Sequence, residues 1–232
     1  MSRHSKPTDG SARLPLLDEG PFTQRILAPG DAHLLAAAEA ALSDQRVADR
    51  LMDGLVAKDD VERSNSFNAL LAAIRLAPDD WCRNWVFFAN LLRSQNAFHR
   101  GIGVKTIVAL ASADKEHHLD SCLDELLRLI DDPKIMVARY VVQSVPELVE
   151  ARPDLKARLT DWLMQIGKAH QPESRKELLR ADAVDALDRI LHHHGERQAA
   201  APFVELALAS SSPKAKKAAR VFLASTVKQK SG

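Results

Sequence analysis

Aromatic residues are scarce in this chain: they make up 5% of its 232 residues and include a single Tyr. Because β-sheets favour aromatic and β-branched side chains, this scarcity argues against a β-rich fold. Few segments alternate with a period of two, whereas apolar residues recur at spacings of three and four, which is typical of amphipathic helices. The sequence therefore predicts an all-α protein.

The chain also has few cysteines, a small net charge and no long apolar run. Two cysteines do not make a disulfide framework, which favours a reducing compartment. A formal net charge of +1 gives no general attraction to nucleic acid or to an anionic membrane. No apolar run approaches the roughly eighteen residues of a membrane span, and the N-terminal segment lacks the apolar centre of a signal peptide. We therefore expect a cytoplasmic protein without a membrane partner.

The chain divides by composition into three parts. Residues 1–30 are rich in proline and glycine and predict a flexible or irregular N-terminal arm. Residues 31–228 carry helical periodicity throughout and predict a single helical domain, in which Ser43 and Ser94 are expected to begin helices. Residues 229–232 predict a frayed C-terminus.

A repeat of about forty residues runs through the predicted domain. Val86, Leu126, Ile166 and Leu206 follow one another at steps of forty residues. A second series consists of arginines in the second helix of each predicted pair, with one member displaced by one residue and another by three. These arginines are Arg63, Arg100, Arg139, Arg180 and Arg220. Helix pairs of this length cannot bury their apolar faces alone, so the pattern predicts that they stack into a solenoid.

One stretch, "LRLIDDPKIMVARYVVQSVPELVEARPDL", resembles a HEAT repeat, whose second helix opens after an Asp-Pro turn with Val, Arg and small or aliphatic residues. The resemblance implies a right-handed α-solenoid of about five antiparallel helix pairs, of the armadillo type. Two residues depart from the family pattern. Ala138 stands where the family usually has its arginine, with Arg139 next to it, and Pro146 is expected to kink the second helix.

The resemblance to HEAT-like proteins also implies a function. Members mostly bind other macromolecules through a concave face, so we expect a non-enzymatic scaffold for a protein partner. The alternative is a nucleic-acid-binding protein, and more remotely a DNA-repair enzyme similar to the bacterial alkylation-repeat DNA glycosylases. For that role, Trp81 and Trp85 with Asp79 or Asp80 form the single local cluster that the sequence offers.

The arginine series has two interpretations. The arginines could line an open groove and contact phosphates or an acidic partner. Alternatively, each arginine could pair with a carboxylate of the neighbouring repeat, with Asp59, Asp60, Asp131 and Asp132 as candidates. Trp81 and Trp85 likewise could form a stacking surface or belong to the core.

Other notable residues favour structural roles. The basic C-terminal segment could reach nucleic acid, but we favour a solvated capping face that keeps the terminal repeat soluble. Three consecutive histidines, His192 to His194, cannot all face one ion on a helix, and the dipole of a helix C-terminus explains the cluster. Cys82 and Cys122 are expected to be free thiols. We predict no catalytic residue, no metal site and no cofactor.

Overall fold

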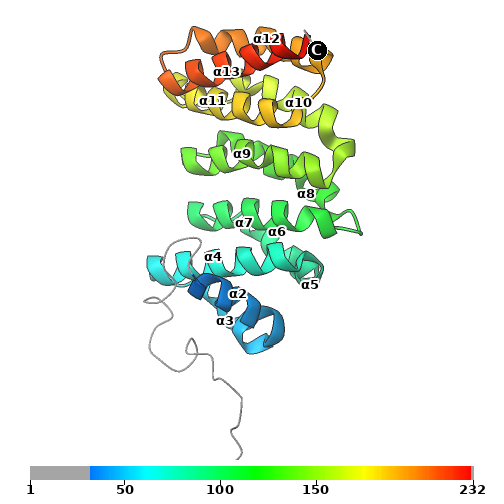
Figure 1. Cartoon of the computed structure of the whole chain (residues 1–232). Helices are drawn as coiled ribbons and strands as arrows, with labels where there is room; N and C mark the ends of the chain where they lie inside the picture. The colour runs from blue at the N-terminus through cyan, green and yellow to red at the C-terminus, as the bar shows by residue number, and fades with distance from the viewer. Residues whose placement is uncertain (1–31, 231–232) are drawn as a thin grey trace, which may run out of the picture. The chain divides into compact units, whose positions relative to one another are not determined.

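The computed structural model describes residues 32–230, and all regular secondary structure within them is helical (Figure 1). The predicted all-α fold is confirmed for these residues, whereas the predicted arm over residues 1–30 lies outside them. Contacts divide the chain into two compact units, residues 1–76 and 77–232, and each is described by itself. The single domain expected over residues 31–228 stays a prediction.

The described part of the first unit consists of three helices that pack against one another. They are α2 (Ala32–Ser43), α3 (Gln45–Gly54) and α4 (Asp60–Leu76). The residue that begins α3 is Asp44 and not the expected Ser43, because a carboxylate oxygen of Asp44 accepts a hydrogen bond of 2.9 Å from the backbone N–H of Arg46. The first free N–H groups of the helix are thus partly satisfied by a side chain.

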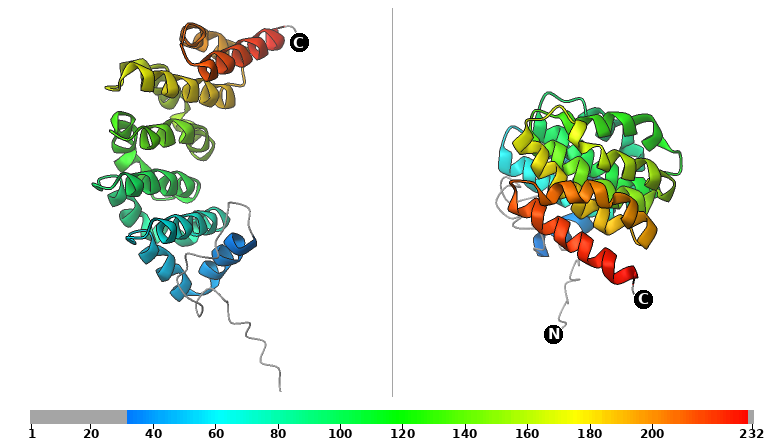
Figure 2. Two further views of the ribbon diagram at one scale, coloured as in Figure 1. Left: turned by 90° about the vertical axis from the view of Figure 1, so that its left-hand side faces the viewer. Right: turned by 90° about the horizontal axis from the view of Figure 1, so that it is seen from above.

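The second unit contains the remaining helices, which follow one another along the chain (Figure 1, Figure 2). The α-helices are α5 (Pro78–Trp81), α6 (Trp85–Leu91), α7 (Ala97–Leu110), α8 (His118–Arg128), α9 (Ile135–Ala151), α10 (Lys156–Met164), α11 (Glu173–Ile190), α12 (His194–Leu208) and α13 (Pro213–Lys230). Single 3-10 turns join several of them: η2 (Cys82–Asn84), η3 (Ala111–Ala113), η4 (Leu129–Asp131), η5 (Pro153–Leu155) and η6 (Ile166–Lys168). The last α-helix extends two residues beyond the predicted end of the domain at residue 228.

Four long helices of the second unit form a layer. α9 packs between α7 and α11, and α11 packs between α9 and α13. α9 begins at Ile135, α11 at Glu173 and α13 at Pro213. The number of residues between successive starts is therefore close to the predicted period of forty. The helices α6, α10 and α12 pack against this layer, and the 3-10 turn η4 that follows α8 packs against α9.

The forty-residue aliphatic series does not share one environment. Leu126 and Ile166 are buried, whereas Val86 and Leu206 are 68% and 61% exposed. Because a helix turns by about 100° per residue, a small difference in loop or helix length rotates equivalent positions away from the core. The repeat is therefore clearer in the spacing of the helices than in any one side-chain position.

Two further expectations can be compared with the helices themselves. α7 begins after Asn96, whose side chain accepts a hydrogen bond of 2.9 Å from the backbone N–H of Phe98, and not at Ser94. α9 is a continuous helix across Pro146, which is buried within it. No helix in the described part of the chain has the length and apolar character to cross a membrane.

Candidate functional site

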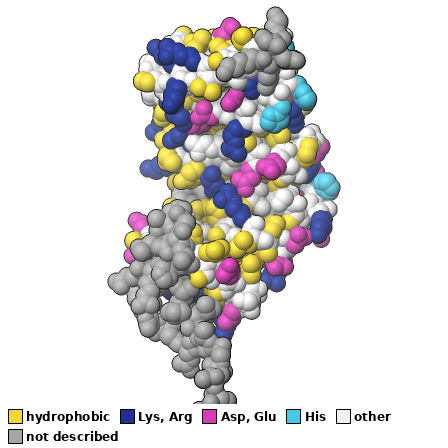
Figure 3. Space-filling view, viewed as in Figure 1, with side chains coloured by type: hydrophobic (Ala, Val, Ile, Leu, Met, Phe, Trp, Pro, Cys, Tyr) yellow, Lys and Arg dark blue, Asp and Glu magenta, His cyan; other side chains and the backbone are white. Residues whose placement is uncertain are grey.

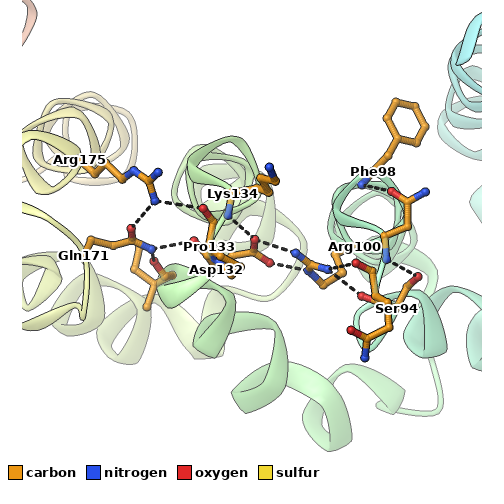
Figure 4. A network of polar contacts seen from close by, with 11 residues as sticks. Ser94, Phe98, Arg100, Asp132, Pro133, Lys134, Gln171 and Arg175 are labelled. Carbon is orange, nitrogen blue, oxygen red and sulfur yellow. Dashed lines mark hydrogen bonds and ion pairs between the residues drawn. The ribbon is translucent and has the colours of Figure 1, made fainter.

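Arg100 pairs with a carboxylate of the next helix pair (Figure 4). Its Nε and Nη2 atoms donate to the two carboxylate oxygens of Asp132 at 2.5 Å and 2.9 Å. Its Nη1 atom also donates to the backbone carbonyls of Ser94 and Gln95, at 2.7 Å and 3.1 Å, in the loop before its own helix. This pairing raises the pKa of Arg100, and it confirms for this residue the interpretation as a link between neighbouring repeats.

The Asp-Pro turn between α8 and α9 is itself held from both sides (Figure 4). A carboxylate oxygen of Asp132 accepts from the backbone N–H of Lys134 at 2.8 Å, which fixes the start of α9. From the following repeat, the Gln171 amide donates to the carbonyl of Asp132 at 2.8 Å, and Arg175 donates to the carbonyl of Pro133 at 3.0 Å. The turn is therefore a structural joint, and the side chain of Asp132 is 1% exposed.

Arg63 in α4 makes a similar contact with its own loop. Its Nη1 atom donates to the carbonyl of Ala57 at 2.6 Å, six residues earlier, and its Nη2 atom pairs with Asp60. The carboxylate belongs to the same helix and not to a neighbouring repeat. Arg63 and Arg100 thus share the loop contact, and only Arg100 makes the predicted link between repeats.

Arg139, which is displaced by one residue from the forty-residue series, uses a different partner. Its Nε and Nη2 atoms donate to Asp182 of α11 at 2.6 Å and 3.1 Å, and Gln143 donates to the same carboxylate at 3.1 Å. From the other side, the Lys214 ammonium of α13 donates to Asp182 at 2.6 Å and lies 3.7 Å from Asp185. A single carboxylate therefore links three helices of the layer, α9, α11 and α13.

We call these contacts of Arg139, Gln143 and Lys214 with Asp182 the ladder. Asp182 lies at its centre, and the side chain of Asp182 is 1% exposed. Burial raises the pKa of its carboxyl group, but the hydrogen bonds and charges of Arg139 and Lys214 outweigh burial and hold the pKa below the ordinary value. At Asp185, burial is the larger influence and the pKa is raised. The ladder keeps Asp182 ionised at neutral pH.

The last two arginines of the series do not join the others. Arg180 lies 3.6 Å from Glu173 of its own helix. Arg220 is exposed, and no ion pair is recorded for it within the described residues. The five arginines therefore do not form one open groove, since at least Arg100 and Arg139 are each bound to a buried carboxylate.

Exposed apolar side chains flank the ladder. Met136 lies one helical turn before Arg139 and is 48% exposed, and Leu178 lies one turn before Asp182 and is 37% exposed. Residues three or four apart share a helix face, so these side chains lie on the same faces of α9 and α11 as the ion pair between them. We call the surface of Met136, Arg139, Gln143, Leu178, Asp182 and Lys214 the ladder face.

The ladder face continues toward α7 with an aromatic contact. The Lys105 ammonium of α7 lies 5.0 Å from the ring centroid of Tyr140 in α9, a cation–π geometry. Dark-blue basic and magenta acidic side chains are interspersed with yellow hydrophobic ones on the side of the molecule that Figure 3 shows. The charges on that side of the molecule are thus mixed in sign.

Both tryptophans of the predicted stacking cluster are buried: Trp81 and Trp85 are each 3% exposed. The ring of Trp85 stacks on that of His118 with centroids 5.5 Å apart, beside a cavity of about 400 Å³ that Cys82 also lines. Asp79 pairs with Lys115 at 2.5 Å. In this arrangement the indoles belong to the core and present no open stacking surface.

The cysteines and histidines take structural positions. Cys82 and Cys122 are free thiols, and burial raises the pKa of Cys122 to about 11. The three consecutive histidines span the junction between α11 and α12, and not a helix C-terminus as expected; the backbone N–H of His193 donates to Glu196 at 3.3 Å and caps α12. Across the described part of the chain, no three His, Cys, Asp or Glu side chains are grouped to hold a metal ion.

A buried arginine in α12, Arg197, was not predicted from the sequence. Its side chain is 3% exposed and pairs with Asp188 at 2.6 Å. The guanidinium carbon also lies 4.0 Å from the centroid of the Phe222 ring of α13. Its other hydrogen-bond acceptors are the carbonyls of Leu191 and Phe222 and the hydroxyls of Ser225 and Thr226. Arg197 shares one contact with Arg63 and Arg100: each of the three donates to the backbone carbonyl six residues before it, which belongs to Leu191, Ala57 and Ser94 respectively.

Comparisons with known proteins leave the family of the chain open. No protein-family model matches the chain, and no curated protein matches it. Among solved structures, the chain is similar to a crystal structure of an engineered protein, with 16% sequence identity and a TM-score of 0.46 over 88% of this chain and 94% of that chain. A likeness of this degree carries no argument about function, which is therefore argued from the ladder face.

Proposed function

We propose that the chain is a non-enzymatic, right-handed HEAT-like α-solenoid of about five helix pairs that binds a protein partner through the ladder face. The side-by-side packing of α7, α9, α11 and α13 supports the solenoid. In HEAT-like arrays the layer of second helices lines the concave side. The ladder face lies on that layer.

The observation that carries the proposal is the combination of exposed apolar side chains with charges that are already paired. Met136 and Leu178 are 48% and 37% exposed on either side of the ion pair between Arg139 and Asp182. Protein interfaces typically combine an apolar centre with polar groups that keep their hydrogen bonds. A partner that covers the two apolar side chains would leave the ladder intact.

The same pairing speaks against nucleic acid as the partner. Binding to a phosphate backbone requires cations that can exchange their counterions for phosphates. Arg100 and Arg139 each already hold a buried carboxylate, Asp132 and Asp182 respectively. The layer thus offers no row of free arginines that a duplex could use.

A quantitative pull-down from the native cell tests the proposal. The bait is the full chain, compared with a Met136→Asp/Leu178→Asp variant. The control is Val86→Asp/Leu206→Asp, at two aliphatic residues of α6 and α12 that are more exposed than Met136 and Leu178. We expect a protein that is retained by the wild type and by the control and lost by the ladder-face variant. A partner lost equally from both variants, or no partner at all, would contradict the proposal.

A DNA titration tests the alternative directly. We expect the full chain to show no saturable binding to a labelled 20-base-pair duplex (an arbitrary probe of about two turns) between low and physiological salt. Saturable binding that weakens steeply with salt would favour nucleic acid over a protein partner.

A further inference from the structure

The last helix of the second unit has one buried side and one free side. Along α13, Ala215, Ala219 and Phe222 are fully buried and Thr226 is 8% exposed, at helical spacings of four and three. This side packs against α11 and α12. The opposite side carries Lys217, Arg220, Val221, Ala224 and Val227, all exposed and also at spacings of three and four.

The free side of α13 contrasts with its neighbours in the layer. α9 has α7 on one side and α11 on the other, and α11 has α9 and α13, whereas α13 packs against α11 along the layer. Val221 and Val227 consequently remain 53% and 66% exposed. The stripe from Lys217 to Val227 spans three turns of helix, about 15 Å, which is enough for another helix to pack along it.

The charge of the free side is uniformly positive. No Asp or Glu occurs between Pro213 and Lys230. Lys214 is bound to Asp182 on the packed side, but no ion pair is recorded for Lys217 or Arg220 in the part of the chain that the structure describes. Figure 3 shows dark-blue side chains at the upper left, over the start of α13.

The joint between α11 and α13 shows what kind of helix fits beside α13. On the α11 side, Asp182 and Asp185 face the Lys214 ammonium at 2.6 Å and 3.7 Å. Glu177 of α11 accepts hydrogen bonds from Ser211, in the loop before α13, and these bonds lower the pKa of its carboxyl group. The start of α13 is thus matched by carboxylates of α11.

We infer that the free side of α13 is a docking surface, separate from the ladder face, for an acidic amphipathic helix of a partner protein. Carboxylates of that helix pair with Lys217 and Arg220, and its apolar residues cover Val221, Ala224 and Val227. A lipid surface fits less well, because membrane-surface helices use Trp, Phe and Leu on the apolar face and this stripe offers two valines and an alanine. Nucleic acid fits less well because the valines interrupt the cations.

A peptide titration tests this surface on the full chain. The probe is a labelled 18-residue amphipathic helix, about five turns, with Ala and Leu on one face and Glu on its flanks; the comparison peptide has Lys in place of each Glu. We expect saturable fluorescence-anisotropy binding of the acidic peptide, at least about tenfold tighter than the basic one. Equal binding of the two peptides, or no binding of either, would overturn the inference.

Two variants locate the binding. Lys217→Glu/Arg220→Glu is expected to weaken the acidic peptide by about tenfold or more, and Val221→Ser/Val227→Ser by about fivefold. The matched control is Lys168→Glu/Arg189→Glu, which changes the net charge equally at two exposed residues elsewhere. Because all these side chains are exposed, the thermal unfolding of each variant should stay close to that of the wild type. Equal losses in the control would show general electrostatics and overturn the inference.

Two further measurements test whether a second copy of the chain or a lipid surface covers the free side of α13 instead. Sedimentation velocity on the full chain should show no dimer that Val221→Ser/Val227→Ser dissociates; such a dimer would assign the surface to a second copy. Flotation with vesicles containing phosphatidylserine should show no binding that depends on Lys217 and Arg220. Vesicle binding lost in that variant, without peptide binding, would assign the surface to lipid.

Discussion

Single buried polar residues hold the helices of the second unit in register, and Arg197 is the most enclosed arginine among the described residues. Arg197→Ala removes a guanidinium whose side chain is 3% exposed and which pairs with Asp188 at 2.6 Å. Loss of a buried, fully bonded charge leaves its acceptors unsatisfied, so we expect a loss of about 3–5 kcal/mol in the free energy of unfolding. Urea denaturation measures it. Arg189→Ala, at an exposed residue of α11, should change stability by less than about 0.5 kcal/mol; similar values for the two variants would contradict the assigned role.

Asp182 predicts a specific dependence of stability on pH. Its pKa is lowered in the folded chain by Arg139 and Lys214 against the effect of burial. A carboxyl group with a lowered folded pKa contributes stability that is complete above its unfolded pKa of about 3.9 and is lost as the pH falls through the folded pKa. We therefore expect Asp182→Asn to lower the free energy of unfolding by about 2 kcal/mol at pH 7.

The same variant should lose less stability than the wild type when the pH falls from about 5 to 2, because it no longer takes up that proton. Parallel acid titrations followed by urea denaturation give the comparison. Glu205→Gln, at an exposed carboxylate of α12, serves as the control and should follow the wild type. Superimposable acid profiles for Asp182→Asn and the wild type would show that the ladder does not depress this pKa.

His117 is the single non-glycine residue with positive φ in the described part of the chain, at φ 56° and ψ 34°. The left-handed region costs an L-residue with a side chain about 1 kcal/mol, so His117→Gly should raise the free energy of unfolding by about that amount. His192→Gly, at an exposed residue outside that region, should have no such effect. Thermal unfolding would contradict the assigned strain if His117→Gly were destabilising.

At the level of single residues, the sequence predicted some of the carboxylates that pair with the arginines and missed others. Asp132 was among the candidate partners of the arginines, and it does bind Arg100. Asp182 was not, because nothing in a linear sequence measures the distance between residues 139 and 182. Asp60 was also a candidate, but it pairs with Arg63 within its own helix.

The contact between α6 and α7 depends on a glycine in the middle of a helix. A Cβ atom at Gly103 would lie 3.0 Å from the backbone oxygen of Phe88 and 3.1 Å from Leu91 and Leu92. Gly103→Ala should therefore destabilise the chain by about 1–3 kcal/mol, although alanine favours a helix by about 1 kcal/mol. Gly195→Ala in α12, with nothing within 4 Å, should be neutral or stabilising. Equal effects of the two substitutions in urea denaturation would show that the close approach does not matter.

At the level of helices, the sequence predicted type and approximate extent well, because helical periodicity and breakers are local properties. The residues that begin helices were less predictable: Asp44 and Asn96 cap α3 and α7, in place of Ser43 and Ser94. All three residue types, Ser, Asp and Asn, can satisfy the free N–H groups at the start of a helix, so composition alone does not choose between neighbouring residues. The role of Gly103 was also missed, since a close approach between helices is a tertiary property.

At the level of the whole molecule, the repeat spacing predicted side-by-side helices but not a common role for the arginines. A shift of one residue turns a side chain by about 100° around a helix. Arg139 therefore faces Asp182 of the next long helix, whereas Arg100 faces its own loop and Asp132. These pairings remove most of the open cationic groove that a nucleic-acid function would use, which is why we propose the apolar part of the ladder face as the surface for a partner.

Site-specific photo-crosslinking tests the central proposal most directly. A benzophenone amino acid is placed at residue 178 of the ladder face or, as a control, at residue 206 of α12, and the cells that express each full-length variant are irradiated. Both residues are exposed leucines, 37% and 61% respectively, so either position reports on its own surface without loss of core packing. The proposal predicts a protein adduct from residue 178 that is absent from residue 206. Adducts only from residue 206, or a nucleic-acid adduct from residue 178, would contradict it.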